Sequence, residues 1–219
     1  MRLILLGLPG AGKGTQAKIL ATRKGLLHIS TGDMFREAAA AGTELGKRAQ
    51  DYMSKGELVP DEVTIGMLLE RIEKPDAQIG LMLDGFPRTI PQAEALDRAL
   101  AGRGQQIDAV LYIQVPESDL MARLTGRWSC PNCGAIYHNQ TKPPKAAGKC
   151  DECGAALTQR ADDQPATVKT RLDTNRAWTE ALADFYRKQG KLHEVDGTGA
   201  MEAITDRLVE SISRIPGAA

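Results

Sequence analysis

The sequence predicts an α/β protein in which a parallel β-sheet is flanked by helices. Two observations predict this class. Short apolar runs alternate with longer segments of helical periodicity, and the first apolar run leads into a glycine-rich loop. Strands that alternate with helices pair in parallel, because each crossover helix returns the chain to the same edge of the sheet. The length of 219 residues suits one domain with insertions.

We expect four strands from short apolar runs, at residues 3–6, 79–88, 107–115 and 191–195. We expect helices at residues 15–23, 32–41, 44–55, 62–73, 89–104, 116–127, 164–190 and 200–215. Thr31 is the expected N-cap of the second helix, and Asp61 that of the fourth. Residues 128–159 are rich in Cys, Pro, Gly and Lys and are expected to form an irregular, functional insertion. Residues 31–59 form a second candidate insertion.

Composition and charge argue against several classes of partner. Lys plus Arg and Asp plus Glu each number 28, and this zero net charge disfavours a broad nucleic-acid footprint. No apolar run approaches the ~20 residues of a membrane span, and the apolar start is too short for a secretion signal. All four cysteines lie within residues 130–153, unlike a secreted disulfide framework. We therefore expect a cytoplasmic protein without nucleic-acid or membrane partners.

The stretch GLPGAGKGT at residues 7–15 is typical of a phosphate-binding loop. Its glycines let backbone N–H groups curl around a polyphosphate, and the lysine adds a positive charge that reaches the β and γ phosphates. The alternative is a glycine-rich turn with an incidental lysine. The loop is expected to contact phosphates through Gly10, Ala11, Gly12, Lys13, Gly14 and Thr15.

The loop departs from the usual pattern at Gly14, where a Ser or Thr normally follows the lysine. Gly14 has no hydroxyl with which to hold Mg²⁺ directly. Thr15 is therefore expected to meet a phosphate oxygen, and the metal is expected to be held mostly through water. Asp84, at the end of a buried apolar run, has the position of an acid that organises magnesium near the phosphates. The alternative for Asp84 is a strand-end aspartate that caps a turn.

The four cysteines have the spacing of a four-thiolate zinc ribbon: Cys130-x-x-Cys133, sixteen residues, then Cys150-x-x-Cys153. A glycine directly after each pair permits the bend that brings backbone amides to the sulfurs. Four sulfurs close the site, so the zinc would be structural and His138 is not needed as a ligand. Two redox pairs or idle thiols are the alternative.

The stretches GLPGAGKGTQA, STGDMFR and DGFPRTIPQA, followed by the later GR, DD and R, resemble the adenylate kinase family across essentially the whole chain. That family transfers a phosphoryl group reversibly from Mg²⁺-bound ATP to AMP, giving two ADP. The resemblance implies a P-loop NTPase-type sheet of five parallel strands, a core of residues 1–29, 60–125 and 164–219, an AMP-binding helical insertion at 30–59 and a zinc-ribbon lid at 126–163. It also implies a monomer.

The resemblance assigns roles to individual residues. Arg36 and Arg88 would hold the AMP phosphate, while the transferring phosphoryl group would be surrounded by Arg123, Arg127, Arg160 and Arg171. The other AMP contacts would be Thr31, Glu57, Leu58, Val59, Gly85, Phe86, Pro87 and Gln92, the last facing the base. ATP would also meet Ile136, Tyr137 and the backbone of Gly199. Asp162 and Asp163 either anchor arginines or position the lid and substrate, or are an acidic pair favoured by a helix N-terminus.

Rival functions remain open at this point. One is a kinase that phosphorylates UMP or CMP, or that uses GTP as donor. Another is a P-loop switch that hydrolyses GTP slowly, although the N-K-x-D guanine motif is absent from the sequence. A third is a zinc-ribbon nucleic-acid module with an ATPase core, which the zero net charge and the 4% aromatic content disfavour.

Overall fold

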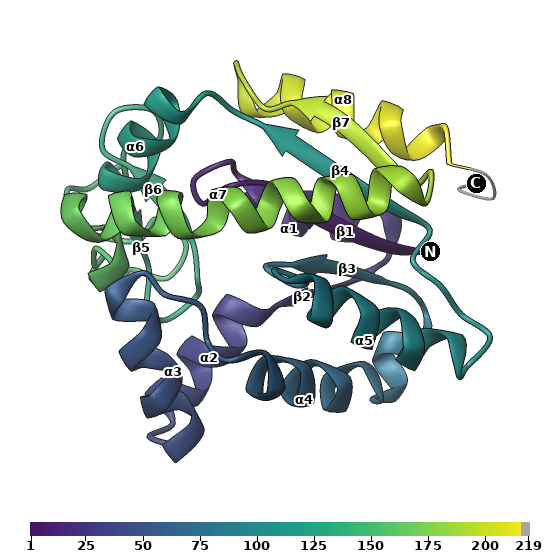
Figure 1. The fold of residues 1–219 in the computed structure, drawn as a ribbon. Helices are drawn as coiled ribbons and strands as arrows, with labels where there is room; N and C mark the ends of the chain where they lie inside the picture. The colour runs from purple at the N-terminus through teal and green to yellow at the C-terminus, as the bar shows by residue number, and fades with distance from the viewer. Residues whose placement is uncertain (216–219) are drawn as a thin grey trace.

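Five parallel strands form the central sheet of the computed structural model, which describes residues 1–215. Their order is β2-β3-β1-β4-β7, so β1 lies in the middle and pairs with β3 and β4 (Figure 1). This confirms the predicted fold class. The strands of the central sheet are β1 (Arg2–Leu6), β2 (Leu27–Ser30), β3 (Leu81–Asp84), β4 (Ala109–Gln114) and β7 (Leu192–Asp196).

Helices cover both faces of this sheet. The helices are α1 (Lys13–Lys24), α2 (Thr31–Ala40), α3 (Glu44–Lys55), α4 (Asp61–Ile72), α5 (Ile90–Ala101), α6 (Glu117–Thr125), α7 (Pro165–Lys188) and α8 (Met201–Ser213), with 3₁₀ turns η1 (Pro75–Gln78) and η2 (Ala161–Asp163). Among the described residues, no helix combines the length and the apolar character that crossing a membrane requires.

Alternate residues of β1 belong to two separate cores, as expected for a sheet covered on both faces. Leu3 and Leu5 pack with α1 and α8, whereas Ile4 and Leu6 pack with α4, α5 and α7. All four leucine and isoleucine side chains are at most 5% exposed. The sheet therefore holds the carboxyl end of β1 rigidly between two layers of helices.

Two segments stand apart from these layers. Helices α2 and α3 project from the end of β2, and we call them the flap (Figure 1). The cysteine segment follows α6 and contains a small antiparallel pair, β5 (Arg127–Ser129) and β6 (Ile136–His138). The expectation of an irregular segment at 128–159 was therefore wrong for these strands, which are only three residues long and show no alternation that could be recognised.

The structure corrects several predicted boundaries. Strand β2 was not predicted from the residues, because it is a four-residue edge strand preceded by no long apolar run. Ser30, not Thr31, caps α2, since its hydroxyl accepts a hydrogen bond from the backbone N–H of Asp33. Asp61 does not cap α4 but is its first residue, and its carboxylate binds side chains of the α5 N-terminus instead. Strand β3 is shorter than the predicted 79–88.

Candidate active site

A cavity of about 220 Å³ opens at the carboxyl ends of β1 and β3, next to α7. This is where the order of a doubly wound sheet reverses and where such folds bind ligands. The cavity is lined by most of the glycine loop and by all six arginines that the sequence singled out: Arg36, Arg88, Arg123, Arg127, Arg160 and Arg171. These arginines come from five separate stretches of the chain.

The glycine loop joins β1 to α1, and its backbone requires glycine at several points, two of them in the middle of the loop. Gly10 and Gly12 have φ values of 86° and 93°, a conformation that residues with a side chain rarely adopt. A Cβ on Gly10 would also lie only 3.0 Å from the Leu124 side chain of α6. Ala11 is the one predicted loop residue that does not line the cavity, because its methyl group is buried and its N–H donates to the Leu8 carbonyl.

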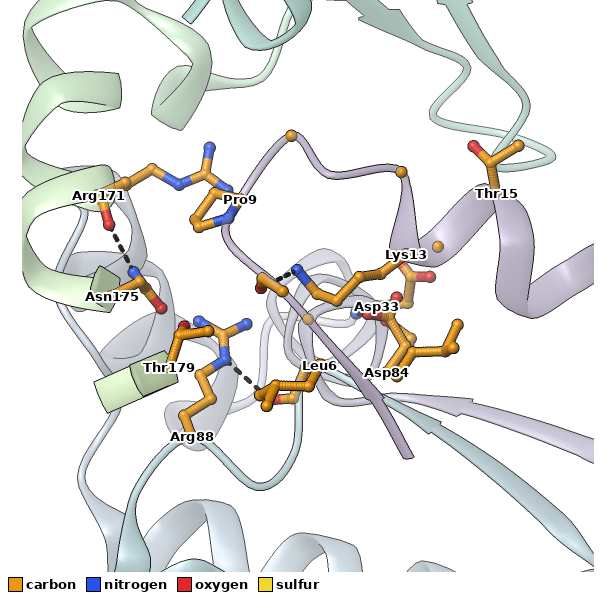
Figure 2. A pocket seen from close by; sticks show the side chains of 18 of the residues that line it. Leu6, Pro9, Lys13, Thr15, Asp33, Asp84, Arg88, Arg171, Asn175 and Thr179 are labelled. Carbon is orange, nitrogen blue, oxygen red and sulfur yellow. Dashed lines mark hydrogen bonds between the residues drawn. The ribbon is translucent and has the colours of Figure 1, made fainter. Parts of the chain in front are cut away.

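Lys13 is the first residue of α1, and its ammonium group lies inside the loop (Figure 2). Its Nζ donates to the carbonyl oxygens of Gly7, at 2.7 Å, and Leu8, at 3.0 Å. Burial lowers the pKa of Lys13 to about 8; nearby Asp84 opposes this shift and neighbouring arginines, Arg88 first, add to it. An anion in the cavity would restore full charge to this side chain.

Asp84 ends β3, as predicted, and lies beside Lys13 at the end of the loop (Figure 2). A Cβ built on Gly14 would come within 3.2 Å of Asp84 Oδ2, so the space beside this carboxylate depends on glycine at position 14. Carboxylate and water oxygens are the ligands that Mg²⁺ prefers. The departure at Gly14 thus fits a hydrated magnesium ion next to Asp84.

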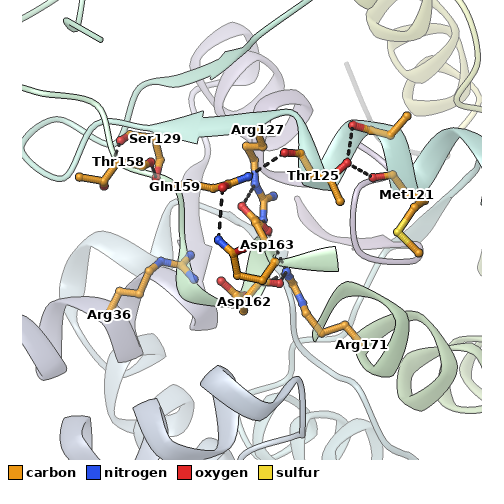
Figure 3. Close-up of polar contacts among 12 residues, drawn as sticks. Arg36, Met121, Thr125, Arg127, Ser129, Thr158, Gln159, Asp162, Asp163 and Arg171 are labelled. Carbon is orange, nitrogen blue, oxygen red and sulfur yellow. Dashed lines mark hydrogen bonds and ion pairs between the residues drawn. The ribbon is translucent and has the colours of Figure 1, made fainter. Parts of the chain in front are cut away.

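Two arginines are anchored by one buried carboxylate (Figure 3). Arg127 binds Asp163 with both ends of its guanidinium group, at 2.8 and 2.5 Å, and Arg171 approaches the same carboxylate at 3.0 Å. Asp163 is fully buried, and Asp162 contacts Arg171 from the same 3₁₀ turn at 3.0 Å. These contacts favour the interpretation that Asp162 and Asp163 anchor arginines over that of a helix N-terminal acid pair.

Within residues 1–215, three of the remaining arginine side chains each have a single polar partner. Arg88 Nε donates to the Gly85 carbonyl at 2.8 Å, Arg123 donates to a carbonyl at the end of β7, and Arg36 pairs with Asp33. Burial and the nearby guanidinium groups lower the pKa of Arg160 to about 10 and also lower that of Arg88. Crowded, partly desolvated cations of this kind form a site that attracts anions.

A second, smaller pocket lies beneath the flap and shares Arg36, Arg88 and Arg171 with the first. The predicted AMP contacts that line it are Thr31, Glu57, Leu58, Val59 and Gln92. Gly85 and Pro87 line the first cavity, whereas Phe86 is buried in the core and lines neither. The two pockets therefore adjoin at the arginines, as two facing anionic groups would require.

Three predicted ATP contacts do not line either pocket: Ile136, Tyr137 and Gly199. The Tyr137 ring is buried in the small core of the cysteine segment, where its hydroxyl accepts from the N–H of Asp151 and lies 3.5 Å from Cys150 Sγ. Gly199 lies past the end of β7, with a φ of 92°. In this arrangement the Tyr137 side chain is not available to a nucleotide.

The four cysteine sulfurs lie within 4.8 Å of one another. A tetrahedral zinc with Zn–S bonds of about 2.3 Å needs sulfurs about 3.8 Å apart, and the pairs Cys130–Cys153 and Cys133–Cys150 are 3.4 and 3.5 Å apart. The glycine after each C-x-x-C pair has a φ near +70°, and its N–H donates to the carbonyl of the first cysteine. The donor set therefore fits a structural zinc ion.

His138 is not part of this cluster. Its ring nitrogens contact the Ala122 carbonyl and the backbone N–H groups of Gln140 and Thr141. Tyr137 contributes instead, because its hydroxyl group lowers the pKa of Cys150 to about 6 and so favours the thiolate that binds a metal.

Sequence reasoning missed part of the cavity wall on α7. Asn175, Trp178 and Thr179 line the first cavity, one and two turns beyond Arg171. Their spacing of three to four residues places them on the same face of the helix, and this periodicity could have identified them. Asp33, within the quoted STGDMFR stretch, also lines the cavity.

Comparison with known proteins agrees with this geometry. A family model described as adenylate kinase matches residues 5–191. The chain is 53% identical over 214 residues to an adenylate kinase of Moorella thermoacetica, covering 98% of this chain and 99% of that protein. An adenylate kinase of Archaeoglobus fulgidus is 53% identical over 215 residues, with 98% and 99% covered. One of Carboxydothermus hydrogenoformans is 54% identical over 204 residues, with 93% and 95% covered.

Proposed function

The chain belongs to the adenylate kinase family, and we propose that it transfers a phosphoryl group reversibly between Mg²⁺-bound ATP and AMP, giving two ADP. The observation that carries this proposal is the convergence of six arginines and the glycine loop on one cavity that adjoins a second pocket under the flap. Two anionic nucleotides can meet only where their phosphates are neutralised. Three of these arginines, Arg36, Arg88 and Arg171, line both pockets and so lie at their junction.

The loop binds the polyphosphate of ATP, with Lys13 at its β and γ phosphates. Arg36 and Arg88 hold the phosphate of AMP, because both line the pocket under the flap. The charge that spreads over the transferring group is stabilised by Arg123, Arg127, Arg160 and Arg171. Catalysis here consists mainly of positioning and preorganised positive charge, since the transfer itself needs little covalent chemistry from the protein.

The protein offers two separate metal sites with different tasks, one in the arginine cavity and one in the cysteine segment. Asp84 would hold hydrated Mg²⁺, which neutralises phosphate charge when it is bound. The four cysteines would hold a closed zinc site that stabilises the cysteine segment and takes no part in the reaction.

We propose that residues 30–59 and 126–163 move as a flap and a lid on a core of residues 1–29, 60–125 and 164–215; residues 216–219 of the predicted core lie outside the described residues. Closure of both over the phosphates would exclude water, which competes with AMP as the phosphoryl acceptor. The backbones of Ile136, Tyr137 and Gly199 would meet ATP from the lid and the β7 end. We expect the protein to act as a monomer in the cytoplasm.

Acceptor and donor specificity test the proposal. The purified protein is supplied with ATP and, in turn, AMP, CMP, UMP and GMP, and the diphosphate products are measured; GTP replaces ATP as donor in a second series. We expect AMP to be the preferred acceptor and ATP the preferred donor. Preferred phosphorylation of UMP or CMP would assign a different kinase, and ATP or GTP hydrolysis without any acceptor phosphorylation would favour a nucleotide switch.

A further inference from the structure

A ring of hydrogen bonds joins the start of α4 to the start of α5, beside the pocket under the flap. Gln92 Nε2 donates to Asp61 Oδ1 at 2.7 Å, and the Thr89 hydroxyl donates to Asp61 Oδ2 at 2.7 Å. The backbone N–H of Arg88 donates to Gln92 Oε1 at 2.7 Å and closes the ring. Asp61 was expected to cap a helix, but its carboxylate is engaged entirely with α5.

This ring fixes the orientation of the Gln92 amide. The Asp61 carboxylate can only accept and the Arg88 N–H can only donate, so the amide must point its nitrogen at Asp61 and its oxygen at Arg88. Turning the amide by half a turn would place two acceptors together at one end and two donors at the other. Gln92 is 1% exposed, so water cannot compensate for those lost bonds.

The amide still has one N–H and one lone pair free, and Gln92 lines the pocket under the flap. Adenine offers a donor at N6 and an acceptor at N1, whereas a 6-oxopurine offers an acceptor at O6 and a donor at N1. An amide that turns freely pairs with either base. An amide held in one orientation pairs with only one, provided that the base itself cannot turn over.

We propose that Asp61 is a positioning residue that sets base selectivity by holding the Gln92 amide in the orientation that pairs with adenine. This inference rests on the proposed function, because it takes AMP as the acceptor and Gln92 as the residue that meets its base. In the proposed complex Arg36 and Arg88 would hold the phosphate and Gln92 would meet the base, and all three residues line this pocket, so a nucleotide held at both ends would not turn its base over to suit the amide. Selectivity against 6-oxopurines then depends on a carboxylate that does not itself touch the nucleotide.

The test compares AMP with inosine monophosphate, which exchanges the donor and the acceptor at positions 6 and 1 and adds no other group. The kcat and KM are measured for both acceptors at saturating ATP in the wild type and in Asp61→Asn, whose amide keeps the shape of the side chain but can accept or donate. We expect the KM for AMP to rise and the AMP-to-IMP ratio of kcat/KM to fall about tenfold, the change expected from one neutral hydrogen bond. The KM for ATP should not change.

Asp76→Asn is the matched control, because Asp76 pairs with Arg71 on the surface beyond the other end of α4. It should leave the ratio unchanged. Gln92→Met gives a second route if Asp61→Asn folds poorly. It should lower the ratio at least as far, because the Arg88 N–H still favours the wild-type amide orientation in Asp61→Asn but has no amide to orient in Gln92→Met. Adding Asp61→Asn to Gln92→Met should lower the ratio no further.

Equal loss of activity towards AMP and IMP in Asp61→Asn would make Asp61 merely structural and overturn the inference. It would also be overturned by a wild type that does not distinguish the two acceptors, or by a Gln92→Met variant with the wild-type ratio. In each of these cases AMP phosphorylation by the wild type would persist, so the proposed function would stand. A wild type that phosphorylates no nucleoside monophosphate would refute the proposed function itself.

Discussion

At Lys13, burial of the side chain disfavours its positive charge. The ammonium group has left water for a site surrounded by guanidinium groups, with only Asp84 as a nearby counter-charge. Two backbone carbonyls hold it in place until a ligand arrives. A phosphate would supply the missing negative charge, so this side chain couples nucleotide binding to both catalysis and proton uptake.

We expect Lys13→Ala to lower kcat/KM by at least about 100-fold, the usual effect of removing one donor from a preorganised anionic site. The fold should persist, because Lys13 hydrogen-bonds only to its own loop. Steady-state rates and thermal melting would be measured beside Lys24→Ala, which removes an exposed lysine at the end of the same helix. Near-normal turnover in Lys13→Ala would contradict the role given to Lys13.

The lowered pKa of Lys13, about 8, predicts that nucleotide binding takes up protons near pH 8. A bound polyphosphate raises this pKa back towards its ordinary value of 10.5, so roughly half a proton is taken up at pH 8 and little below pH 7. Calorimetric titration with a non-transferable ATP analogue, in two buffers of different ionisation enthalpy, measures the uptake. It should disappear in Lys13→Met. An uptake that is the same in this variant would assign the proton to another group.

The same shift affects the stability of the nucleotide-free protein. The pKa of Lys13 is lower in the folded than in the unfolded state, so the unfolded state binds more protons between pH 8 and 10.5. The cost of burying the charged group is therefore fully present below pH 8. It declines as the pH rises through this interval.

At the scale of elements, the cysteine segment has too small a core of its own and would depend on a bound metal for much of its stability. That core consists of five buried residues, two of which are cysteines: Cys130, Ala135, Tyr137, Cys150 and Leu157. So little apolar area cannot offset the conformational entropy of a segment this long. The two C-x-x-C turns, each followed by a glycine with positive φ, bring the sulfurs together, and a zinc ion held there would supply the remaining stability.

We expect the protein to bind about one zinc ion per chain and the variant Cys150→Ser to lose it. A loss of about 2 kcal/mol would lower the melting temperature by about 4–8 °C for a chain of this size. Turnover at low temperature should be affected less than thermal stability, because no cysteine lines the arginine cavity. Metal analysis and thermal melting check this, with Thr141→Ala as an exposed control in the same segment. Unchanged melting in Cys150→Ser would rule out a structural site.

Elements with strong local signals could be predicted from the sequence. The bounds of α3 agree with the prediction at both ends, because Thr43 caps its start and Gly56, with a φ of 78°, ends it. Strands β2, β5 and β6 were not predicted, since each has only three or four residues, too few to show a period. In addition, the partner of strand β2 is β3, which is distant in sequence. Ser30 and Thr31 are both good caps; in the structure the Ser30 hydroxyl accepts from the Asp33 N–H, whereas the Thr31 hydroxyl donates to the Gly85 carbonyl, a contact that is distant in sequence.

The residues of the candidate site also divide into those with a local sequence signal and those without one. The glycine loop, Asp84 and the four cysteines could be recognised from local patterns, because neighbouring residues carry the chemistry. The convergence of six arginines could be anticipated only through the family resemblance, since nothing in the sequence near Arg36 indicates that Arg160 will lie beside it. The ring around Asp61 was not anticipated, because it joins residues of two helices, and the bonded residues are 28 and 31 positions apart in the sequence.

At the scale of the whole molecule, positive charge gathers where the parts of the chain meet. One lysine and six arginines line the first cavity against two aspartates, Asp33 and Asp84, and the two acids of η2 offset only part of the excess. The guanidinium groups lower one another's pKa, so their approach costs free energy while the cavity lacks an anion. With the proposed movement of flap and lid, an anion would favour the arrangement in which the arginines surround it over any more open one.

We expect nucleotide phosphates to close the molecule and to stabilise it. Saturation with ADP at 100 times its Kd should add about 2.7 kcal/mol to the free energy of unfolding, and the radius of gyration from small-angle scattering should decrease. Tripolyphosphate should produce part of both effects at low ionic strength and less in concentrated NaCl, because salt screens the cations that drive closure. In Arg160→Gln the response to tripolyphosphate should weaken. If instead the radius of gyration is the same with and without ligand, the flap and the lid do not move on the core, and charge repulsion in the empty cavity is relieved without any change of shape.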